Sequence, residues 1–159
     1  MKKHLVGEWM TSDVISVSPK ASLIDVKRLM SSKHIRRVPV VDKGKLVGIV
    51  TLGDVREASP SDATSLSVYE LNYLLARLTI DQFMTRSVIT VTPYTEIYAT
   101  AELMLEHKIG GLPVVSNGKL VGIVTESDIF RVLVEEKRSE MSADGATRSP
   151  AALLAPVAA

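Results

Sequence analysis

The sequence predicts an α/β protein made of two tandem β-α-β-β-α repeats that pack against each other with pseudo-two-fold symmetry. The first observation is an ungapped internal repeat at an offset of 74 positions, whose longest match is the identical octapeptide at 44–51 and 118–125. The second is the order of hydrophobic patterns, since each copy changes between strand and helix periods in the same places. Small duplicated units pack together to bury their apolar faces, so we expect a functional site at the junction between the copies.

The overall composition is that of a globular protein without a strong charge. The 159 residues are 46% hydrophobic and 23% charged, and 19 Lys and Arg face 18 Asp and Glu, which gives a net charge of +1. A charge this close to zero gives no case for nucleic acid or membrane phosphates as partners. A polynucleotide partner would draw only on Lys2, Lys3, Arg36, Arg37 and Lys43, which are not continued into a basic face.

Residue types that serve metal and covalent chemistry are scarce. The chain contains no cysteine, which excludes disulfides and thiol nucleophiles and fits a reducing compartment. Its histidines, His4, His34 and His107, have no spacing typical of metal ligands, so we predict neither a metal site nor a catalytic centre. The first residues do not resemble a signal peptide, and no apolar run is long enough to span a membrane. We therefore expect a cytoplasmic protein without membrane insertion.

The first two elements of each copy are a short strand and a capped helix. Alternating and β-branched residues at 14–17 and 88–91 predict strands that end before Pro19 and Pro93. Ser22 is placed to cap a helix that continues for about ten residues. The equivalent helix of the second copy has an apolar stripe that consists of Ile97, Ala101, Met104 and Leu105.

The second half of each copy has the pattern of a β-hairpin followed by a helix. Apolar residues at 38–41 and 46–50 flank a polar turn, and the second copy has Asn117-Gly118 there, a dipeptide typical of tight hairpins. A helix then begins near Thr51, and in the second copy near Thr125. Methionines recur at equivalent positions and are expected to fill the core; they are Met10, Met30, Met84 and Met104.

These elements divide the chain into four segments. The first repeat with its N-terminal lead covers 1–58, and the second repeat covers 83–138. Between them, 59–82 begins as a loop rich in Ser and Pro and continues as a packing helix with regularly spaced leucines. The last segment, 139–159, is rich in Ala, Ser and Pro without periodicity, which predicts a frayed, flexible tail. We expect no further catalytic domain, because the repeats and the linker occupy most of the chain.

The best candidate for chemistry is a Thr-x-x-Asp motif at the end of each hairpin, formed by Thr51 with Asp54 and by Thr125 with Asp128. The strand would bring a hydroxyl, and the following helix a carboxylate, to one place. A carboxylate accepts hydrogen bonds from the 2′ and 3′ hydroxyls of a ribose, and the free N–H groups of a helix start favour phosphate. The same motif also fits a capping box that only stabilises the helix. Both interpretations stay open on this pattern alone.

Arg36 and Arg37 are the second candidate, because guanidinium groups bind phosphate with two parallel hydrogen bonds. The second copy has Gly110-Gly111 at the same positions. The cleft with the arginines should therefore take a more anionic ligand than its twin. A solvated strand start explains the arginines equally well. His34 could donate to a phosphate, although its place at the end of a surface helix explains it as well.

Together these motifs resemble a tandem pair of CBS domains, also called a Bateman module. The resemblance covers about 9–133 and rests on Met-Thr, the strand and proline before a helix, Pro-Val-Val, and Gly-x-x-Val-Gly-Ile-Val-Thr-x-x-Asp, each present twice. It implies two clefts between the repeats and a non-catalytic regulatory role, with AMP, ADP, ATP or S-adenosylmethionine as ligand. It also implies a homodimer and a separate regulated protein that responds to the ligand.

The resemblance assigns a role to each candidate residue. It makes Asp54 and Asp128 the carboxylates that hold the ribose. The polar groups near ribose or phosphate are Thr51, Thr125, Arg36 and Arg37. The residues that resemble those enclosing adenine are Val14, Ile15, Val38 and Pro39 in the first copy, with Val88, Ile89, Leu112 and Pro113 in the second.

A second hypothesis treats the chain as a ligand-free dimerisation or interaction module in which Thr-x-x-Asp only caps helices. The two hypotheses differ in what Asp54→Ala and Asp128→Ala change, since a site loses ligand affinity whereas a cap loses only stability. A small phosphotransferase or hydrolase is disfavoured, because the sequence shows no nucleophile with a base and no metal cluster.

Overall fold

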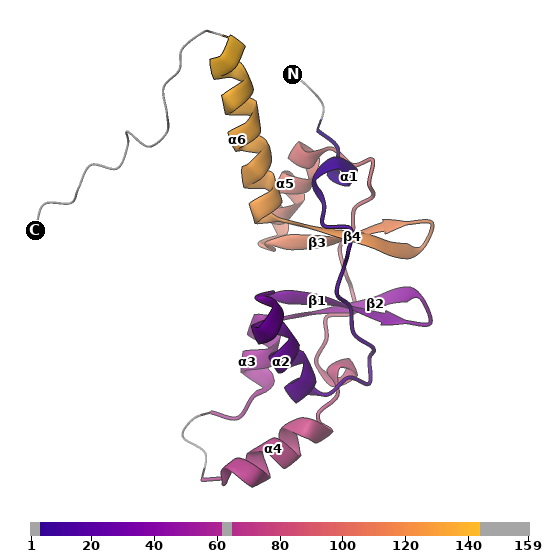
Figure 1. Cartoon of the computed structure of the whole chain (residues 1–159). Coiled ribbons are helices and arrows are strands. Elements are labelled where there is room, and N and C mark those ends of the chain that lie inside the picture. Colours follow the sequence, from indigo (N-terminus) through magenta and orange to yellow (C-terminus); the bar gives the residue numbers. More distant parts are fainter. Residues whose placement is uncertain (1–3, 62–64, 144–159) are drawn as a thin grey trace, which may run out of the picture.

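The computed structural model describes residues 4–61 and 65–143. Figure 1 shows two layers, one for each repeat, with the two sheets facing each other at the centre. The first repeat consists of α2 (Leu23–Lys33), β1 (Arg37–Asp42), β2 (Lys45–Thr51) and α3 (Leu52–Ala58). The second consists of α5 (Ile97–His107), β3 (Gly111–Ser116), β4 (Lys119–Thr125) and α6 (Glu126–Ala143). The predicted α/β class and the tandem repeats are confirmed.

Each sheet is a two-stranded antiparallel hairpin, as the hydrophobic pattern predicts. β1 pairs with β2, and β3 pairs with β4 in an equivalent register. The first turn has positive φ angles at Lys43 (48°) and Gly44 (79°), and the second at Asn117 (50°) and Gly118 (75°). Two consecutive positive φ angles are typical of the type I′ turn, whose twist matches that of the flanking strands. The first repeat therefore adopts the turn that Asn-Gly predicts for the second, with a lysine in place of the asparagine.

The strands predicted at 14–17 and 88–91 are reduced to a single parallel bridge each. Val17 donates its N–H to the Pro39 carbonyl at 3.1 Å and forms one bridge with β1. The ladder stops there because the next bonds on either side would need an N–H from Pro39 or from Pro19, and proline has none. The prediction of regular strands is therefore corrected. The second repeat has the same arrangement around Val91, Pro93, Pro113 and Val115.

The segment in front of each repeat packs on the other repeat. The short helix α1 (Val6–Trp9) lies in the layer of the second repeat, where Val6 is fully buried (Figure 1). Ile97 donates its N–H to the His4 carbonyl at 2.9 Å, and Leu23 makes the equivalent bond to the Leu78 carbonyl at 2.8 Å. The two repeats therefore exchange their leads, and the division into 1–58, 59–82 and 83–138 follows the sequence repeat rather than the packing.

The two hydrophobic cores confirm the expected role of the methionines. Met30, Met84 and Met104 are buried, and Met10 packs against the core of the second repeat. Met84 reaches the first core from the other side of the linker and lies on Gly48 of β2, where a Cβ would come within 2.5 Å of its sulfur. A glycine in the middle of a strand is thus explained by a methionine from the exchanged lead.

The linker and the last helix complete the fold. The predicted linker helix is α4 (Val68–Arg77), which packs on α2 and is followed by a short 3-10 helix (Ile80–Gln82). The helix α6 continues to Ala143, so residues 139–143 are helical rather than part of the predicted tail. Glu, Lys and Arg favour helix, and no proline or glycine interrupts them before that point. The rest of the predicted tail, 144–159, lies outside the described residues.

Candidate ligand-binding site

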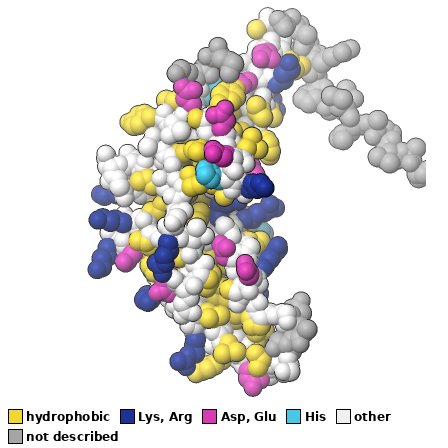
Figure 2. Space-filling model, turned by 180° about the vertical axis from the view of Figure 1, so that it is seen from behind, with side chains coloured by type: hydrophobic (Ala, Val, Ile, Leu, Met, Phe, Trp, Pro, Cys, Tyr) yellow, Lys and Arg dark blue, Asp and Glu magenta, His cyan; other side chains and the backbone are white. Residues whose placement is uncertain are grey.

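Two cavities open between the repeats, and basic side chains surround the region where the repeats meet. Figure 2 shows Lys and Arg side chains gathered around the mid-height of the molecule. We call the cavities the Thr51 cavity and the Thr125 cavity, after the threonine at the end of β2 or β4 that lines each one. Their volumes are about 710 Å³ and about 510 Å³, respectively. Both values are within the range of small-molecule sites, about 300–1,000 Å³.

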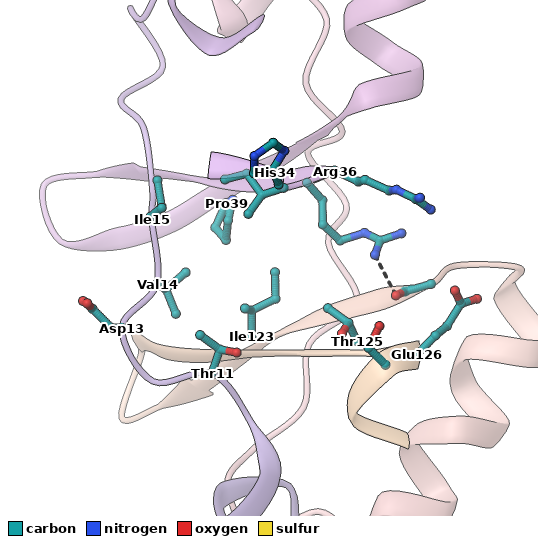
Figure 3. Close-up of a pocket in the computed structure, with 14 residues that line it drawn as sticks. Thr11, Asp13, Val14, Ile15, His34, Arg36, Pro39, Ile123, Thr125 and Glu126 are labelled. Carbon is teal, nitrogen blue, oxygen red and sulfur yellow. Dashed lines mark hydrogen bonds between the residues drawn. The ribbon is translucent and has the colours of Figure 1, made fainter. Parts of the chain in front are cut away.

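Each cavity has an apolar wall from one repeat and a threonine from the other. In the Thr125 cavity, Val14 and Ile15 lie on the extended segment before α2, while Thr125 lies on β4 (Figure 3). The Thr51 cavity repeats this arrangement with Val88 and Ile89. The remaining apolar lining residues are Ile35, Pro39 and Ile123 in the Thr125 cavity, and Ile49, Leu52, Ile109, Leu112 and Pro113 in the Thr51 cavity.

The sequence identified most of these wall residues but not how they combine. The sequence pattern describes each copy by itself, whereas each cavity is lined by residues of both repeats. Val38 differs from the expectation, because it is fully buried in the first core and lines neither cavity. Neighbouring strand residues point to opposite faces, so Pro39 lines the cavity while Val38 points into the core.

Arg37 connects the two repeats at the wall between the cavities. Its Nη1 donates a hydrogen bond to the Gly110 carbonyl at 2.7 Å, drawn as a dashed line in Figure 3. Burial lowers the pKa of the Arg37 guanidinium, whereas the nearby Glu126 carboxylate raises it. A Cβ on Gly111 would lie 2.9 Å from Arg37 Cδ. The Gly-Gly pair therefore provides the space into which the arginine of the other repeat extends.

Arg36 and Arg37 line both cavities rather than one. The expectation that the twin cleft lacks their charge is wrong. The pseudo-two-fold axis places these arginines beside Gly110 and Gly111. The Arg-Arg pair of one repeat and the equivalent Gly-Gly pair of the other therefore meet at a wall that both cavities share. A ligand in either cavity can reach a guanidinium group.

Thr51 and Asp54 form the capping box of α3. Asp54 Oδ2 accepts hydrogen bonds from Thr51 N at 2.7 Å and from Thr51 Oγ1 at 2.8 Å. Thr51 lines the cavity, whereas Asp54 stands just behind it and does not. Within 4–61 and 65–143, no donor is bound to Asp54 Oδ1. One oxygen of this carboxylate, beside the cavity, is therefore unpaired among the described residues.

Thr125 and Asp128 form the equivalent box at the start of α6, but it is more closed. Thr125 N and Oγ1 donate to Asp128 Oδ2 at 2.8 and 3.0 Å. Arg131 Nη1 donates to Asp128 Oδ1 at 3.1 Å, and Asp128 is only 4% exposed. Glu57 stands where Arg131 would be in the first repeat, so that repeat has no such ion pair. A ligand hydroxyl would have to displace Arg131 to reach this carboxylate.

Several charged and polar side chains of the cavities were missed by the sequence reasoning, namely Asp13, Arg56, Ser87, Lys108 and Glu126. His34 was considered, and it lines the Thr125 cavity. His34 and Lys108 occupy equivalent positions, each with a left-handed φ of 53° directly after a helix. The signal that would have found them is a comparison of the two copies position by position at the 74-residue offset.

Residues 4–61 and 65–143 contain neither a membrane-spanning helix nor a cluster of metal ligands. No helix there combines the length and the apolar character needed to cross a membrane. Nor do three or more His, Cys, Asp or Glu side chains come together there as a metal site.

The fold and the cavities define a class of protein in which two tandem α/β repeats enclose two cavities of small-molecule size. The family model of the CBS domain matches residues 6–61 and 80–135. The chain therefore belongs to the CBS domain family and contains a tandem pair of these domains.

Known relatives extend this comparison. The chain is 34% identical over 132 residues to protein MJ1225 of Methanocaldococcus jannaschii, which covers 82% of the chain but 47% of that protein. The crystal structure of the CBS domain pair of MJ0100, in complex with 5′-methylthioadenosine and S-adenosyl-L-methionine, has a TM-score of 0.70 and 29% identity, covering 85% of this chain and 99% of that one. The crystal structure of CBSX2 from Arabidopsis thaliana in complex with AMP has a TM-score of 0.70 and 30% sequence identity, and the match covers 84% of this chain and 98% of that one. The chain thus spans about half the length of the MJ1225 protein.

Proposed function

We propose that this chain is a non-catalytic regulatory module that binds an adenosine-containing ligand, AMP, ADP, ATP or S-adenosylmethionine, between its two repeats. The observation that carries the proposal is the repeated combination of an apolar wall, a strand-end threonine with its capping aspartate, and the shared arginines. The relatives whose structures contain AMP, or S-adenosyl-L-methionine with 5′-methylthioadenosine, support the same class of ligand.

The residues of the Thr51 cavity suggest how such a ligand lies. An adenine ring would pack between Val88, Ile89 and Pro113, because a flat apolar ring needs an apolar slot. The ribose would donate a hydroxyl to Asp54 Oδ1, and the phosphates would lie toward Arg36 and the other cations. The Thr125 cavity is lined by the equivalent Val14, Ile15, Pro39 and Thr125, while Asp128 lies outside its lining with both carboxylate oxygens already hydrogen-bonded.

Signalling would follow from the position of the ligand between two layers. A ligand that contacts both repeats binds more tightly to one relative orientation of the repeats than to another. It shifts the equilibrium between these orientations only by that difference in affinity. A separate regulated protein in the cytoplasm, and a homodimer of the module, are part of the same proposal.

The second candidate is a ligand-free interaction module. It is favoured by the two capping boxes, whose carboxylates already accept hydrogen bonds, and by exposed apolar side chains on α6. Phe130 is 62% exposed, Leu133 49% and Val134 50%. A helix face of this kind fits contact with another protein surface.

Thermal unfolding with millimolar AMP, ADP, ATP, S-adenosylmethionine and a GTP control separates the two candidates. A ligand at about 100 times its dissociation constant adds roughly 2.7 kcal/mol to the stability of the folded state. We expect one or more adenosine ligands to raise the Tm by several degrees, and GTP to raise it less. A panel without any shift would favour the interaction module.

A matched pair of variants distinguishes a lost cap from a lost site. Asp54→Ala removes a cap beside a cavity, whereas Glu70→Ala removes the Ser67–Glu70 capping box of α4, which lines neither cavity. Both variants should lower the Tm of the free protein. Only Asp54→Ala should reduce the additional shift caused by ligand, and an undiminished shift in that variant contradicts the proposed role of Asp54.

A further inference from the structure

The two cavities differ sharply in charge although their walls are equivalent. The Thr51 cavity is lined by Arg36, Arg37, Arg56 and Lys108, and no carboxylate is among its lining residues. The Thr125 cavity has the same Arg36 and Arg37 but adds two acids, Asp13 and Glu126. With a neutral histidine, the second set of side chains sums to zero charge, whereas the first carries four positive charges.

Equivalent positions of the two repeats produce this difference. Asp13 in one cavity corresponds to Ser87 in the other, and His34 corresponds to Lys108. Glu126, the first residue of α6, corresponds to Leu52, the first residue of α3. At each of these positions, the Thr51 cavity has the less negative or more positive side chain. The backbone is equivalent in the two repeats, so the side chains at these positions decide the difference in charge between the cavities.

The acids of the Thr125 cavity stand where they weaken anion binding. Asp13 and Glu126 lie at opposite ends of the cavity (Figure 3). Glu126 also stands beside Arg37, because a Cβ on Gly110 would be 2.9 Å from both the Arg37 Nη2 and the Glu126 Oε2 atoms. A phosphate entering this cavity would compete with Glu126 for the guanidinium group and would face the negative charge of Asp13.

We propose that the Thr51 cavity takes an adenosine polyphosphate and that the Thr125 cavity takes an adenosine ligand without phosphate, either uncharged or cationic. This inference rests on the proposed function and assigns a ligand class to each site. Arg56 and Lys108 supply the additional positive charge that a triphosphate needs. Asp54 lies beside the first site with no donor on its Oδ1 among the described residues, whereas Asp128 Oδ1 is bound to Arg131 beside the second.

Exchanging side chains between equivalent positions tests this assignment with residues that the fold already accepts. Isothermal titration calorimetry at low ionic strength would measure ATP, adenosine and S-adenosylmethionine. We expect the wild type to bind one ATP, and the ATP-saturated protein to bind one adenosine or S-adenosylmethionine. Ser87→Asp with Lys108→His gives the Thr51 cavity the residues of its twin at two of the three positions. This double variant should weaken the affinity for ATP by about tenfold or more.

The reverse exchange should create a second polyphosphate site. Asp13→Ser with His34→Lys is expected to raise the stoichiometry of ATP from one to two. The control is Lys43→Asn, which removes a lysine with positive φ outside both cavities and inserts the residue of the equivalent turn, Asn117. This control should leave ATP affinity unchanged. Two equal ATP sites in the wild type, or an unchanged ATP affinity after Ser87→Asp with Lys108→His, would overturn the assignment.

Inorganic tripolyphosphate separates this inference from the proposed function. If no adenosine ligand binds the wild type, the proposed function fails. Tripolyphosphate binding that disappears after Ser87→Asp with Lys108→His would then still show that the Thr51 cavity is the anion site. If neither the adenosine ligands nor tripolyphosphate bind, both the proposed function and the assignment of the cavities are overturned.

Discussion

The two Thr-x-x-Asp motifs begin at the last residue of identical octapeptides, yet their carboxylates differ in exposure and in hydrogen bonding. Asp54 is partly exposed and has one carboxylate oxygen without a donor among the described residues, whereas Asp128 is 4% exposed and both of its oxygens accept hydrogen bonds. The cause is one residue outside the motif, because Arg131 in the second repeat corresponds to Glu57 in the first. A duplicated motif therefore specifies the cap, and its neighbours decide how much of the carboxylate remains for a ligand.

The largest effect is expected when the two aspartates are removed in turn. Asp128→Ala removes a nearly buried carboxylate that accepts hydrogen bonds from the Thr125 N–H, the Thr125 hydroxyl and the exposed Arg131 guanidinium, so it should cost about 2–3 kcal/mol of the free energy of unfolding. Asp54→Ala should cost about 1 kcal/mol, the usual loss for a cap. Urea denaturation measures both, and equal losses would contradict the difference between the two boxes.

A second comparison concerns the Arg-Arg and Gly-Gly pairs. Gly111→Ala places a Cβ 2.9 Å from Arg37 and should cost about 1–2 kcal/mol by overpacking. In an Arg37→Ala background, the same change should cost far less, since the crowded side chain is gone. A double-mutant cycle of denaturation free energies measures the coupling. Additive effects would show that the glycine does not make room for the arginine.

The ion pair that closes the second box should contribute little by itself. Arg131 has a side chain that is 60% exposed, so Arg131→Ala should lower the stability by about 0.5 kcal/mol or less. A second substitution is more informative. Asp128→Ala should lower the free energy of unfolding less in the Arg131→Ala background than in the wild type. An undiminished cost would mean that Arg131 does not account for the difference between the repeats.

The smallest effect is a pH-dependent contact that only one repeat has. Lys20 Nζ lies 2.8 Å from Asp81 Oδ2 and, with the Thr79 hydroxyl, lowers the pKa of Asp81 from 3.8. A lowered pKa stabilises the fold above the unfolded value, and this contribution fades as the pH falls through the folded value. Asp81→Asn should therefore lower the Tm slightly at pH 7 and by less at pH 3. A difference in Tm that is the same at both values would contradict this.

The sequence predicted the elements that depend on local pattern. The hairpins follow from alternating residues around a turn dipeptide, and the helix starts at Ser22 and Thr51 follow from capping residues. The single bridges at Val17 and Val91 were not predictable in this way, since they depend on which residue of another strand a proline faces.

The sequence also identified most of the apolar walls and both capping aspartates, but not the composition of each cavity. The exchange of leads rests on a four-residue helix and on backbone hydrogen bonds, which leave no periodic pattern in the sequence. The pattern of a single copy also does not show that Arg36 and Arg37 reach the wall shared by both cavities, because the pseudo-two-fold packing of the repeats places them there. Among the charged residues that distinguish the cavities, Lys108 and Glu126 lie at the ends of helices and Asp13 lies on the segment before α2. All of them stand outside the repeated motifs, so only the spatial arrangement reveals their role.

A crystal structure of the protein grown with ATP tests the central claim most directly. The account predicts a nucleotide in the Thr51 cavity, with its base beside Val88 and Ile89, a ribose hydroxyl on Asp54, and its phosphates near Lys108. A nucleotide found only in the Thr125 cavity would contradict the assignment of the sites. Both cavities empty at a saturating concentration of ATP would contradict the binding function itself.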